Sequence, residues 1–234
     1  MPNNRSRKDK KMNPYYSEDG IEIFLGDCRE VLPQIGSVEL VLTDPPYGLK
    51  QDRAQVVSRG KRGPESKRFV PATDYGDFGW DSTPASDLAI QMTVASADQA
   101  IVWGGNYFCL PPSAGWLVWD KVNGKSDFAD CELAWTNLPQ AVRLFRHMWN
   151  GMMRESENDA PRVHPTQKPL ALFKWCLSFA PGAETILDPF MGSGTTLRAA
   201  KDLGRRAIGI EIEEKYCEIA AKRLSQKVFD FEGQ

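Results

Sequence analysis

The sequence has few of the residues that build metal sites or disulfide frameworks. Only two histidines occur, His147 and His164, which makes a histidine-based metal site improbable. The five cysteines are odd in number, scattered, and contain no Cys-x-x-Cys pair; they are Cys28, Cys109, Cys131, Cys176 and Cys217. This spacing supports neither a disulfide framework nor a zinc site. We therefore predict a protein without a metal centre.

The sequence also lacks the apolar core of a signal peptide and any run long enough to span a membrane. Its net charge of −2 gives no overall indication of a nucleic-acid partner. The charge is unevenly distributed, however, because the first dozen residues hold five basic side chains, Arg5, Arg7, Lys8, Lys10 and Lys11. We predict that residues 1–19 form a flexible basic arm, and we expect a cytoplasmic protein without a membrane partner.

The length of 234 residues suits one domain with a substantial core. Helical spacing is clear before Pro181-Gly182 and again near the C-terminus. Strands are predicted at 21–25, 38–42, 100–103, 116–119, 132–135, 185–187 and 207–212. Strands that alternate with helices predict an α/β domain with a mostly parallel sheet, which we place at residues 20–230. The tryptophans Trp80, Trp103, Trp119, Trp135 and Trp149 are interpreted as core or rim aromatics.

The tetrapeptide Asp44-Pro45-Pro46-Tyr47 directly follows a predicted buried strand. An aspartate at the carboxyl end of such a strand lies where open α/β sheets bind ligands. The prolines fix φ and remove backbone donors, which leaves the Pro45 carbonyl as an acceptor. One carboxylate, one carbonyl and one flat ring suit a planar ring that bears an amino group. The alternative interpretation is a rigid turn in which Asp44 caps a helix.

Residues 48–74 interrupt the alternation of strands and helices with a polar, basic stretch. A long loop of this kind inside a compact domain is usually functional or disordered. Its basic side chains suit phosphate contacts; they are Lys50, Arg53, Arg59, Lys61, Arg62, Lys67 and Arg68. A merely solvated loop is the alternative.

A second motif joins a strand, a glycine turn and a helix start: residues 185–196 read Thr-Ile-Leu-Asp-Pro-Phe-Met-Gly-Ser-Gly-Thr-Thr. Gly192 and Gly194 allow a tight turn and a close approach of the backbone to a ligand. The next strand ends at Glu211, about where nucleotide-binding folds place a carboxylate on ribose hydroxyls. No Gly-Lys-Ser/Thr follows, and the third glycine of the dinucleotide fingerprint is missing. The motif therefore predicts an adenosine-type ligand without a pyrophosphate.

Together the two motifs resemble the DNA amino-methyltransferases that use S-adenosylmethionine. The β-class of that family places the catalytic tetrapeptide first and the glycine loop near the C-terminus, as here. Three further motifs extend the resemblance over about residues 20–225: Leu-Gly-Asp-Cys at 25–28, His-Pro-Thr-Gln-Lys-Pro at 164–169 and Gly-Ile-Glu at 209–211. It implies a Rossmann-like class I methyltransferase fold: a seven-stranded, mostly parallel sheet with helices on both faces and a circularly permuted motif order.

The resemblance also implies catalytic roles for the tetrapeptide. Asp44 and the Pro45 carbonyl would accept the two hydrogens of the target amine, Pro46 would complete the turn, and Tyr47 would stack on a base flipped out of the duplex. Residues 103–107, Trp-Gly-Gly-Asn-Tyr, follow a predicted strand and are a weaker candidate for the wall of the pocket.

A further set of residues would bind the cofactor. Glu211 would accept from the ribose hydroxyls, and Asp27 and Cys28 would border the cofactor adenine. His164, which alone could equally be an ordinary turn residue, would approach the methionyl group with Thr166 and Lys168. The full set that the resemblance implies is Asp27, Cys28, Asp44, His164, Thr166, Lys168, Asp188, Phe190, Gly192, Ser193, Gly194, Thr195 and Glu211.

DNA is the substrate that the resemblance implies. The basic residues of 48–74, with Arg143 and Arg146, form the predicted DNA-binding set. The target-recognition segment, residues 138–163, is short for the family, which suggests a short or relaxed recognition site and would suit a phage or mobile-element enzyme. A homodimer and a cognate restriction endonuclease are further partners that the resemblance allows.

Asp44 favours adenine, because the family's cytosine-amine enzymes more often carry serine at that position. Methylation of the cytosine amine is the alternative within the same fold. RNA and protein-glutamine methyltransferases commonly carry Asn-Pro-Pro-Tyr and place the glycine loop first, so residue 44 and the motif order both argue against them. A catalytically silent DNA-binding module is disfavoured by the intact Asp44, Tyr47, Gly192 and Gly194.

Overall fold

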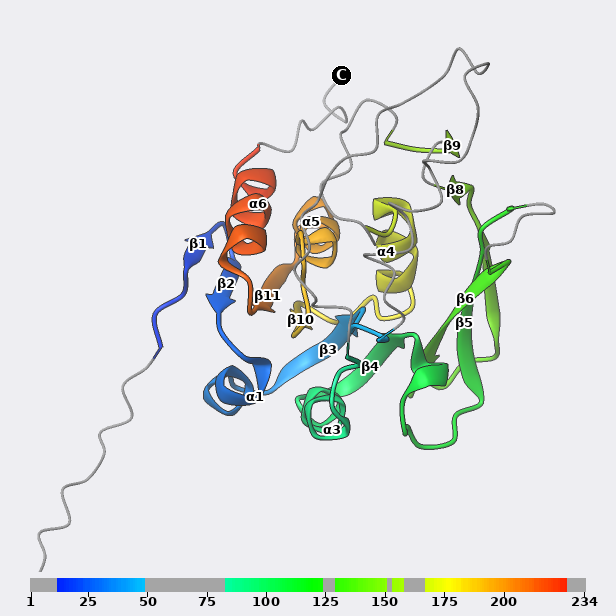
Figure 1. Cartoon of the computed structure of the whole chain (residues 1–234), viewed down its shortest axis with the longest axis horizontal. Helices are drawn as coiled ribbons and strands as arrows, with labels where there is room; N and C mark the ends of the chain where they lie inside the picture. Colours follow the sequence, from blue (N-terminus) through cyan, green and yellow to red (C-terminus); the bar gives the residue numbers. More distant parts are fainter. Residues whose placement is uncertain (1–11, 49–82, 124–128, 151–152, 158–166, 227–234) are drawn as a thin grey trace, which may run out of the picture.

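The computed structural model describes residues 12–48, 83–123, 129–150, 153–157 and 167–226. Its central feature is a mixed sheet flanked by helices (Figure 1). The sheet contains β1 (Tyr16–Glu18), β2 (Ile21–Leu25), β3 (Val38–Thr43), β4 (Ala97–Trp103), β5 (Gly115–Asp120), β6 (Cys131–Thr136), β7 (Arg143–Arg146), β10 (Thr185–Asp188) and β11 (Arg206–Glu211). Two further short strands, β8 (Trp149–Asn150) and β9 (Met153–Arg154), pair only with each other.

The order of the strands is β1-β2-β11-β10-β3-β4-β6-β5-β7. Strands β2, β11, β10, β3 and β4 are all parallel to one another, whereas β6 pairs antiparallel with both β4 and β5. The middle of the sheet is apolar, as in β3, because helices cover it on both sides. The five parallel strands end at one edge of the sheet, so the segments that follow them meet there.

Helices cover both faces of the sheet (Figure 1). One face carries α4 (Leu170–Leu177), α5 (Thr195–Asp202) and α6 (Glu214–Leu224), and the other carries α1 (Cys28–Val31) and α3 (Asp87–Ala95). Two 3-10 turns, η1 (Leu32–Gln34) and η2 (Gly105–Tyr107), complete the described elements. Within the described ranges, no helix has the length and apolarity needed to cross a membrane.

Two apolar clusters form the core, one on each face of the sheet. Leu40 and Ile186 point into the cluster beneath α4 to α6, while the next residues along the same strands, Val41 and Leu187, join the cluster beneath α1 and α3. This division follows from the alternation of side chains along a strand. Trp103, Trp119, Trp135 and Trp149 are buried, which confirms their interpretation as core aromatics; Trp80 lies outside the described residues.

The fold class and all seven predicted strands are confirmed, but the predicted number of strands is wrong, because the described residues form a main sheet of nine. The additional strands, β1 and β7, are the outermost ones and are mostly exposed, so they lack the apolar runs used to find strands. Strand β1 lies within the predicted arm of residues 1–19 and pairs antiparallel with β2, so the arm cannot extend that far. Residues 1–11 lie outside the described residues.

Candidate active site

A cleft of about 500 Å³ opens at the carboxyl edge of the parallel strands. Its wall is built from the segments that follow β2, β3, β10 and β11. Among the predicted cofactor residues, those that line it are Asp27, Cys28, Asp44, Lys168, Asp188, Phe190, Gly192, Ser193, Thr195 and Glu211. The structure therefore brings together, around one cleft, pieces of chain that are far apart in sequence.

Three predicted cofactor residues do not line the cleft or are not described. Gly194 instead supplies the left-handed turn before α5, with a φ of +77°, and a side chain there would bring its Cβ within 2.9 Å of Ala220 Cβ. His164 and Thr166 lie outside the described residues. The wall also has an apolar part that was not predicted from the sequence; it contains Phe173, Ile210, Ile212 and Tyr216.

Glu211 and Asp188 hold the glycine loop from two sides. The carboxylate of Glu211 accepts hydrogen bonds from the backbone N–H groups of Gly192 at 3.0 Å and Glu213 at 2.9 Å. The carboxylate of Asp188 accepts from the hydroxyls of Thr43 at 2.6 Å and Thr196 at 2.5 Å. The loop is thus attached to the end of β11 and to the end of β3.

Burial dominates the acidity of these two carboxyls. It raises the pKa of Glu211 to about 7, although the backbone N–H groups favour the ionised form. It likewise raises the pKa of Asp188 to about 6, against the hydroxyls of Thr196 and Thr43. Both groups therefore titrate closer to neutral pH than ordinary carboxyls do.

Asp44, Tyr47 and Lys168 form the polar centre of the site. One oxygen of Asp44 accepts a short hydrogen bond from the Tyr47 hydroxyl, and the other forms a short ion pair with the Lys168 ammonium. Lys168 Nζ also lies 3.2 Å from the Tyr47 hydroxyl and 3.1 Å from Glu132 Oε2. The ammonium thus donates hydrogen bonds to Asp44 and Tyr47 and forms a further ion pair with Glu132. Lys168 is buried, so these partners matter for its stability.

Glu132 is a site residue that the sequence analysis did not identify. It lies in β6, and its carboxylate pairs with Lys168 and with Lys121, which directly follows β5. The only signal in the sequence is a single charged residue in a strand that otherwise reads Cys-Leu-Ala-Trp-Thr. Such a residue normally faces solvent, so the signal alone would not have assigned it to the site.

The charges in this group depend on one another. Burial raises the pKa of the Asp44 carboxyl, and the Lys168 cation opposes that rise without cancelling it. Burial acts to lower the pKa of the Lys168 ammonium, but Asp44 and then Glu132 outweigh it, so the pKa is raised. Burial also acts against the charge of Glu132, yet Lys168 and Lys121 lower the pKa of this carboxyl to about 2. Lys168 and Glu132 are therefore charged at neutral pH.

An aromatic surface adjoins this polar centre. The ring of Tyr107 stacks on that of Tyr47 with centroids 5.1 Å apart and an angle of 22° between the planes. Gly104 makes the arrangement possible, because a Cβ at that position would lie 2.0 Å from Tyr47 Cε1. Tyr107 is 50% exposed, whereas Trp103 is fully buried. Residues 103–107 therefore contact Tyr47 through Gly104 and Tyr107.

The predicted DNA-binding residues lie mostly outside the described residues, including Lys50, Arg53, Arg59, Lys61, Arg62, Lys67 and Arg68. Arg143 and Arg146 are described, and both are exposed in the outermost strand, β7. Arg146 forms an ion pair with Asp120 at 3.0 Å. Neither arginine lines the cleft as far as the described residues define it.

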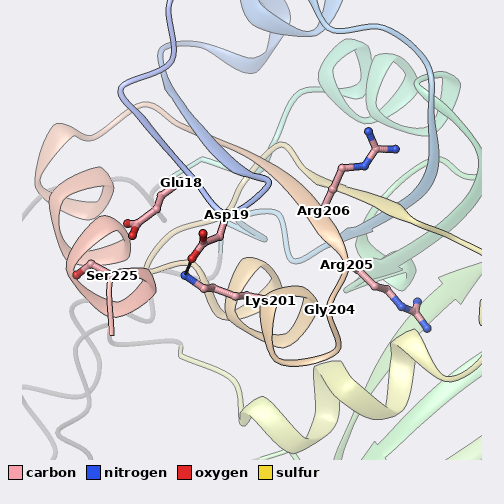
Figure 2. Close-up of a pocket in the computed structure, with 7 residues that line it drawn as sticks. All are labelled: Glu18, Asp19, Lys201, Gly204, Arg205, Arg206 and Ser225. Carbon is pink, nitrogen blue, oxygen red and sulfur yellow. Dashed lines mark hydrogen bonds and ion pairs between the residues drawn. The ribbon is translucent and has the colours of Figure 1, made fainter. Parts of the chain in front are cut away.

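A second hollow, of about 570 Å³, lies at the amino ends of β2 and β11, opposite the first (Figure 2). Its charged side chains already have partners. Lys201 pairs with Asp19 at 3.1 Å, and Arg205 donates hydrogen bonds to the carbonyls of Leu177 and Ala180. No predicted site residue lines it. We therefore assign the function to the cleft at the carboxyl edge.

Comparisons with known proteins identify the family of the chain. The sequence model of a family described as DNA methylase matches residues 115–222. The Type II methyltransferase M2.LlaDCHI of Lactococcus lactis subsp. cremoris is 43% identical over 250 residues, which cover 91% of this chain and 92% of the relative. The Type II methyltransferase M.HinfI of Haemophilus influenzae is 28% identical, and the match covers 87% of this chain and 68% of the relative.

Solved structures support the same fold. The M1.HpyAVI–SAM complex superimposes with a TM-score of 0.53 and 22% identity, covering 88% of this chain and all of that one. PvuII DNA methyltransferase, described as cytosine-N4-specific, has a TM-score of 0.55 and 14% identity, covering 94% of this chain and 91% of that one. Because a relative 43% identical spans nearly the whole chain, the chain belongs to the N6/N4 DNA methylase family and is an S-adenosylmethionine-dependent DNA methyltransferase.

Proposed function

We propose that this enzyme transfers a methyl group from S-adenosylmethionine to the 6-amino group of adenine in DNA. The observation that supports it best is that Asp44 lines the same cleft as the glycine loop and Glu211. An acceptor for amine hydrogens and a site for the methyl donor therefore share one cavity. Adenine is preferred over cytosine because residue 44 is aspartate and not serine. The cytosine amine remains the second candidate, since PvuII DNA methyltransferase is described as cytosine-N4-specific.

The residues of the cleft fit the proposed cofactor. Glu211 offers acceptors suited to ribose hydroxyls, and the apolar Phe190 and Ile212 suit the faces of a purine. In the proposed assignment, Asp27 and Cys28 border the adenine, and Asp188, Ser193 and Thr195 lie toward the methionyl portion. A contact between Lys168 and the methionyl carboxylate is also part of the proposal. It requires Lys168 to exchange one of its present partners, Asp44, Tyr47 or Glu132.

In the proposed mechanism Asp44 overcomes the weak nucleophilicity of the target amine. The lone pair of that nitrogen is delocalised into the base, so a planar amine reacts poorly. By accepting one hydrogen each, Asp44 and the Pro45 carbonyl favour a tetrahedral nitrogen whose lone pair is free to attack. S-adenosylmethionine supplies the methyl group when bound. The nitrogen gains the methyl carbon as the carbon–sulfur bond breaks, and it then loses one proton to the Asp44 carboxylate.

Stacking holds the base in the proposed complex. The amine is inaccessible within a duplex, so the base must leave the helix before it reacts. Tyr47 would stack on the flipped base, and Tyr107 extends the same aromatic surface toward solvent. Basic side chains of residues 48–74, with Arg143 and Arg146, would contact phosphates. The proposal further includes a cytoplasmic location, a short or relaxed recognition site, a homodimer, and a cognate restriction endonuclease.

The identity of the methylated nucleoside tests the proposed substrate. Purified protein incubated with labelled S-adenosylmethionine and unmethylated DNA of mixed sequence should yield N6-methyladenine after enzymatic digestion and mass spectrometry. RNA and protein serve as control substrates and should remain unlabelled. Recovery of N4-methylcytosine instead would replace adenine with the second candidate.

Replacement of Asp44 tests the role of its carboxylate. Asp44→Ala should reduce the rate of methyl transfer by at least about 100- to 1,000-fold, as expected when one preorganised electrostatic group is removed. Cofactor binding measured by calorimetry should be largely retained. Asp98→Ala, an exposed position in β4, is the matched control and should behave as wild type. Substantial turnover by Asp44→Ala would refute this mechanism.

Replacement of Tyr107 tests the aromatic surface. Tyr107→Ala should raise the KM for DNA about tenfold, because stacking of one base on an aromatic ring contributes about 1–3 kcal/mol. Tyr107→Phe preserves the ring and should keep the KM near the wild-type value. The kinetics should be measured at saturating cofactor. Equal KM values for Tyr107→Ala and wild type would show that this ring does not contact the substrate.

The raised pKa of Glu211 predicts a pH-dependent cofactor affinity. Its pKa is about 7, so the carboxyl is increasingly protonated as the pH falls below that value. A protonated carboxyl has less acceptor capacity for ribose hydroxyls, and the Kd should therefore decrease as the pH rises through 7. The Kd should be measured by calorimetry at pH values on both sides of 7. Glu211→Gln lacks the titrating carboxyl, so comparison with this variant separates the effect of Glu211 from that of Asp188. A wild-type pH dependence that persists in Glu211→Gln would exclude Glu211 as its source.

A further inference from the structure

Four charged side chains form a continuous series, here called the charge chain, that leads from the end of β5 to the catalytic tetrapeptide. Its members in order are Lys121, Glu132, Lys168 and Asp44. The signs alternate, and two ammonium groups balance two carboxylates. Buried charges are tolerated when they are paired in this way, whereas removal of one partner leaves an uncompensated charge. Each member therefore affects its neighbours.

Glu132 is the member that the sheet holds most firmly. Strand β6 is paired on both sides, with β4 and with β5, and Glu132 itself lies opposite Trp119. Lys121 in turn lies 5.2 Å from the centre of the Trp119 ring. Lys168, by contrast, precedes α4 and reaches the group with a long side chain. Glu132 therefore provides a fixed point to which the Lys168 ammonium is attached.

The ammonium of Lys168 is shared between two carboxylates. If Glu132 carried no charge, Asp44 would be the one carboxylate paired with Lys168, and the ammonium would stabilise the ionised form of Asp44 more strongly. A carboxylate stabilised in that way is a weaker hydrogen-bond acceptor for an amine. It is also a weaker base for the proton that the amine releases. Glu132 does not line the cleft, so its influence on a substrate must pass through Lys168.

We propose that Glu132 is a positioning residue of the methyl-transfer site, which shares the Lys168 ammonium with Asp44 and so keeps Asp44 able to accept from the target amine. This inference rests on the proposed role of Asp44. Nothing in the two motifs points to Glu132, since it lies in a different strand. The inference deepens the proposed mechanism, because a residue outside the cleft then determines how strongly Asp44 accepts hydrogen bonds from the target amine.

Several groups face Asp44 and must be considered together. The Tyr47 hydroxyl belongs to the same segment, Lys168 comes from the residues before α4, Glu132 from β6, and Asp188 from β10. Burial raises the pKa of Asp44, Lys168 opposes the rise, and Glu132 adds to it. Cys176 in α4 is a further titratable group near Lys168, and its thiol stays neutral because burial raises its pKa. Loss of the Glu132 charge should therefore lower the pKa of Asp44.

The direct test is a titration of Asp44 by ¹³C NMR of aspartate carboxyls in the full chain without cofactor. Asp44→Asn assigns the resonance. Glu132→Gln should lower the titration midpoint of Asp44 by at least about half a pH unit, a threefold change in its proton affinity. Glu132→Asp retains the charge and should remain closer to wild type. Glu218→Gln, which removes an exposed carboxylate in α6, is the control and should leave the midpoint unchanged.

Lys121→Gln gives an independent test with the opposite sign. Loss of the Lys121 charge leaves more of the negative charge of Glu132 uncompensated, so the titration midpoint of Asp44 should move to higher pH. Lys121 lies at the outer end of the charge chain, and this variant also serves if Glu132→Gln does not fold. Downward movement in Glu132→Gln and upward movement in Lys121→Gln would support the inference. An unchanged midpoint in either folded variant would overturn it.

Single-turnover methylation links this titration to activity. With cofactor-loaded enzyme and DNA, Glu132→Gln should lower the maximal rate constant several-fold and move the acid limb of its pH profile to lower pH. Glu132→Asp should restore part of both. A merely structural defect would reduce the fraction of active enzyme without moving the acid limb of the pH profile. If the NMR midpoints move as expected but Asp44→Asn methylates DNA at the wild-type rate, the charge chain stands and the proposed role of Asp44 fails.

Discussion

The buried carboxylate of Asp188 joins the two parts of the site. It accepts hydrogen bonds from Thr43, the last residue of β3, from Thr196 in α5, and from the backbone N–H of Phe190. Asp44 directly follows Thr43. The distance between the proposed amine acceptor and the cofactor loop is therefore set by one hydrogen-bonded group in the interior. That precision has an energetic cost, since the carboxyl is removed from water.

The charged residues that line the cleft are predominantly acidic, and this suits a ligand that carries a sulfonium and an amine. Asp44, Asp188 and Glu211 all have raised pKa values because they are buried before the cofactor arrives. A cationic ligand would return part of the lost solvation energy. The only buried cation among the described residues of the cleft, Lys168, is already paired with carboxylates.

The parts of the site that follow strand ends could be predicted from the sequence, because a strand, a turn and a glycine loop are local patterns. Asp44, Gly192 and Glu211 were found in this way. Glu132 was not, since its position depends on the antiparallel pairing of β6, and periodicity does not report which strands become neighbours. The pairing of Lys168 with Glu132 was missed for the same reason. The edge strands β1 and β7 escaped detection because exposed strands need no apolar run.

The pairing of β5 with β6 has a consequence that reaches beyond the fold. Successive side chains of a strand point to opposite faces, so a slip of one residue in this pairing would turn Glu132 to the other side of the sheet. Lys168 would then lose one of its two anionic partners, although every motif residue stayed in place. The register of two strands far from both motifs in sequence thus decides whether Glu132 reaches Lys168.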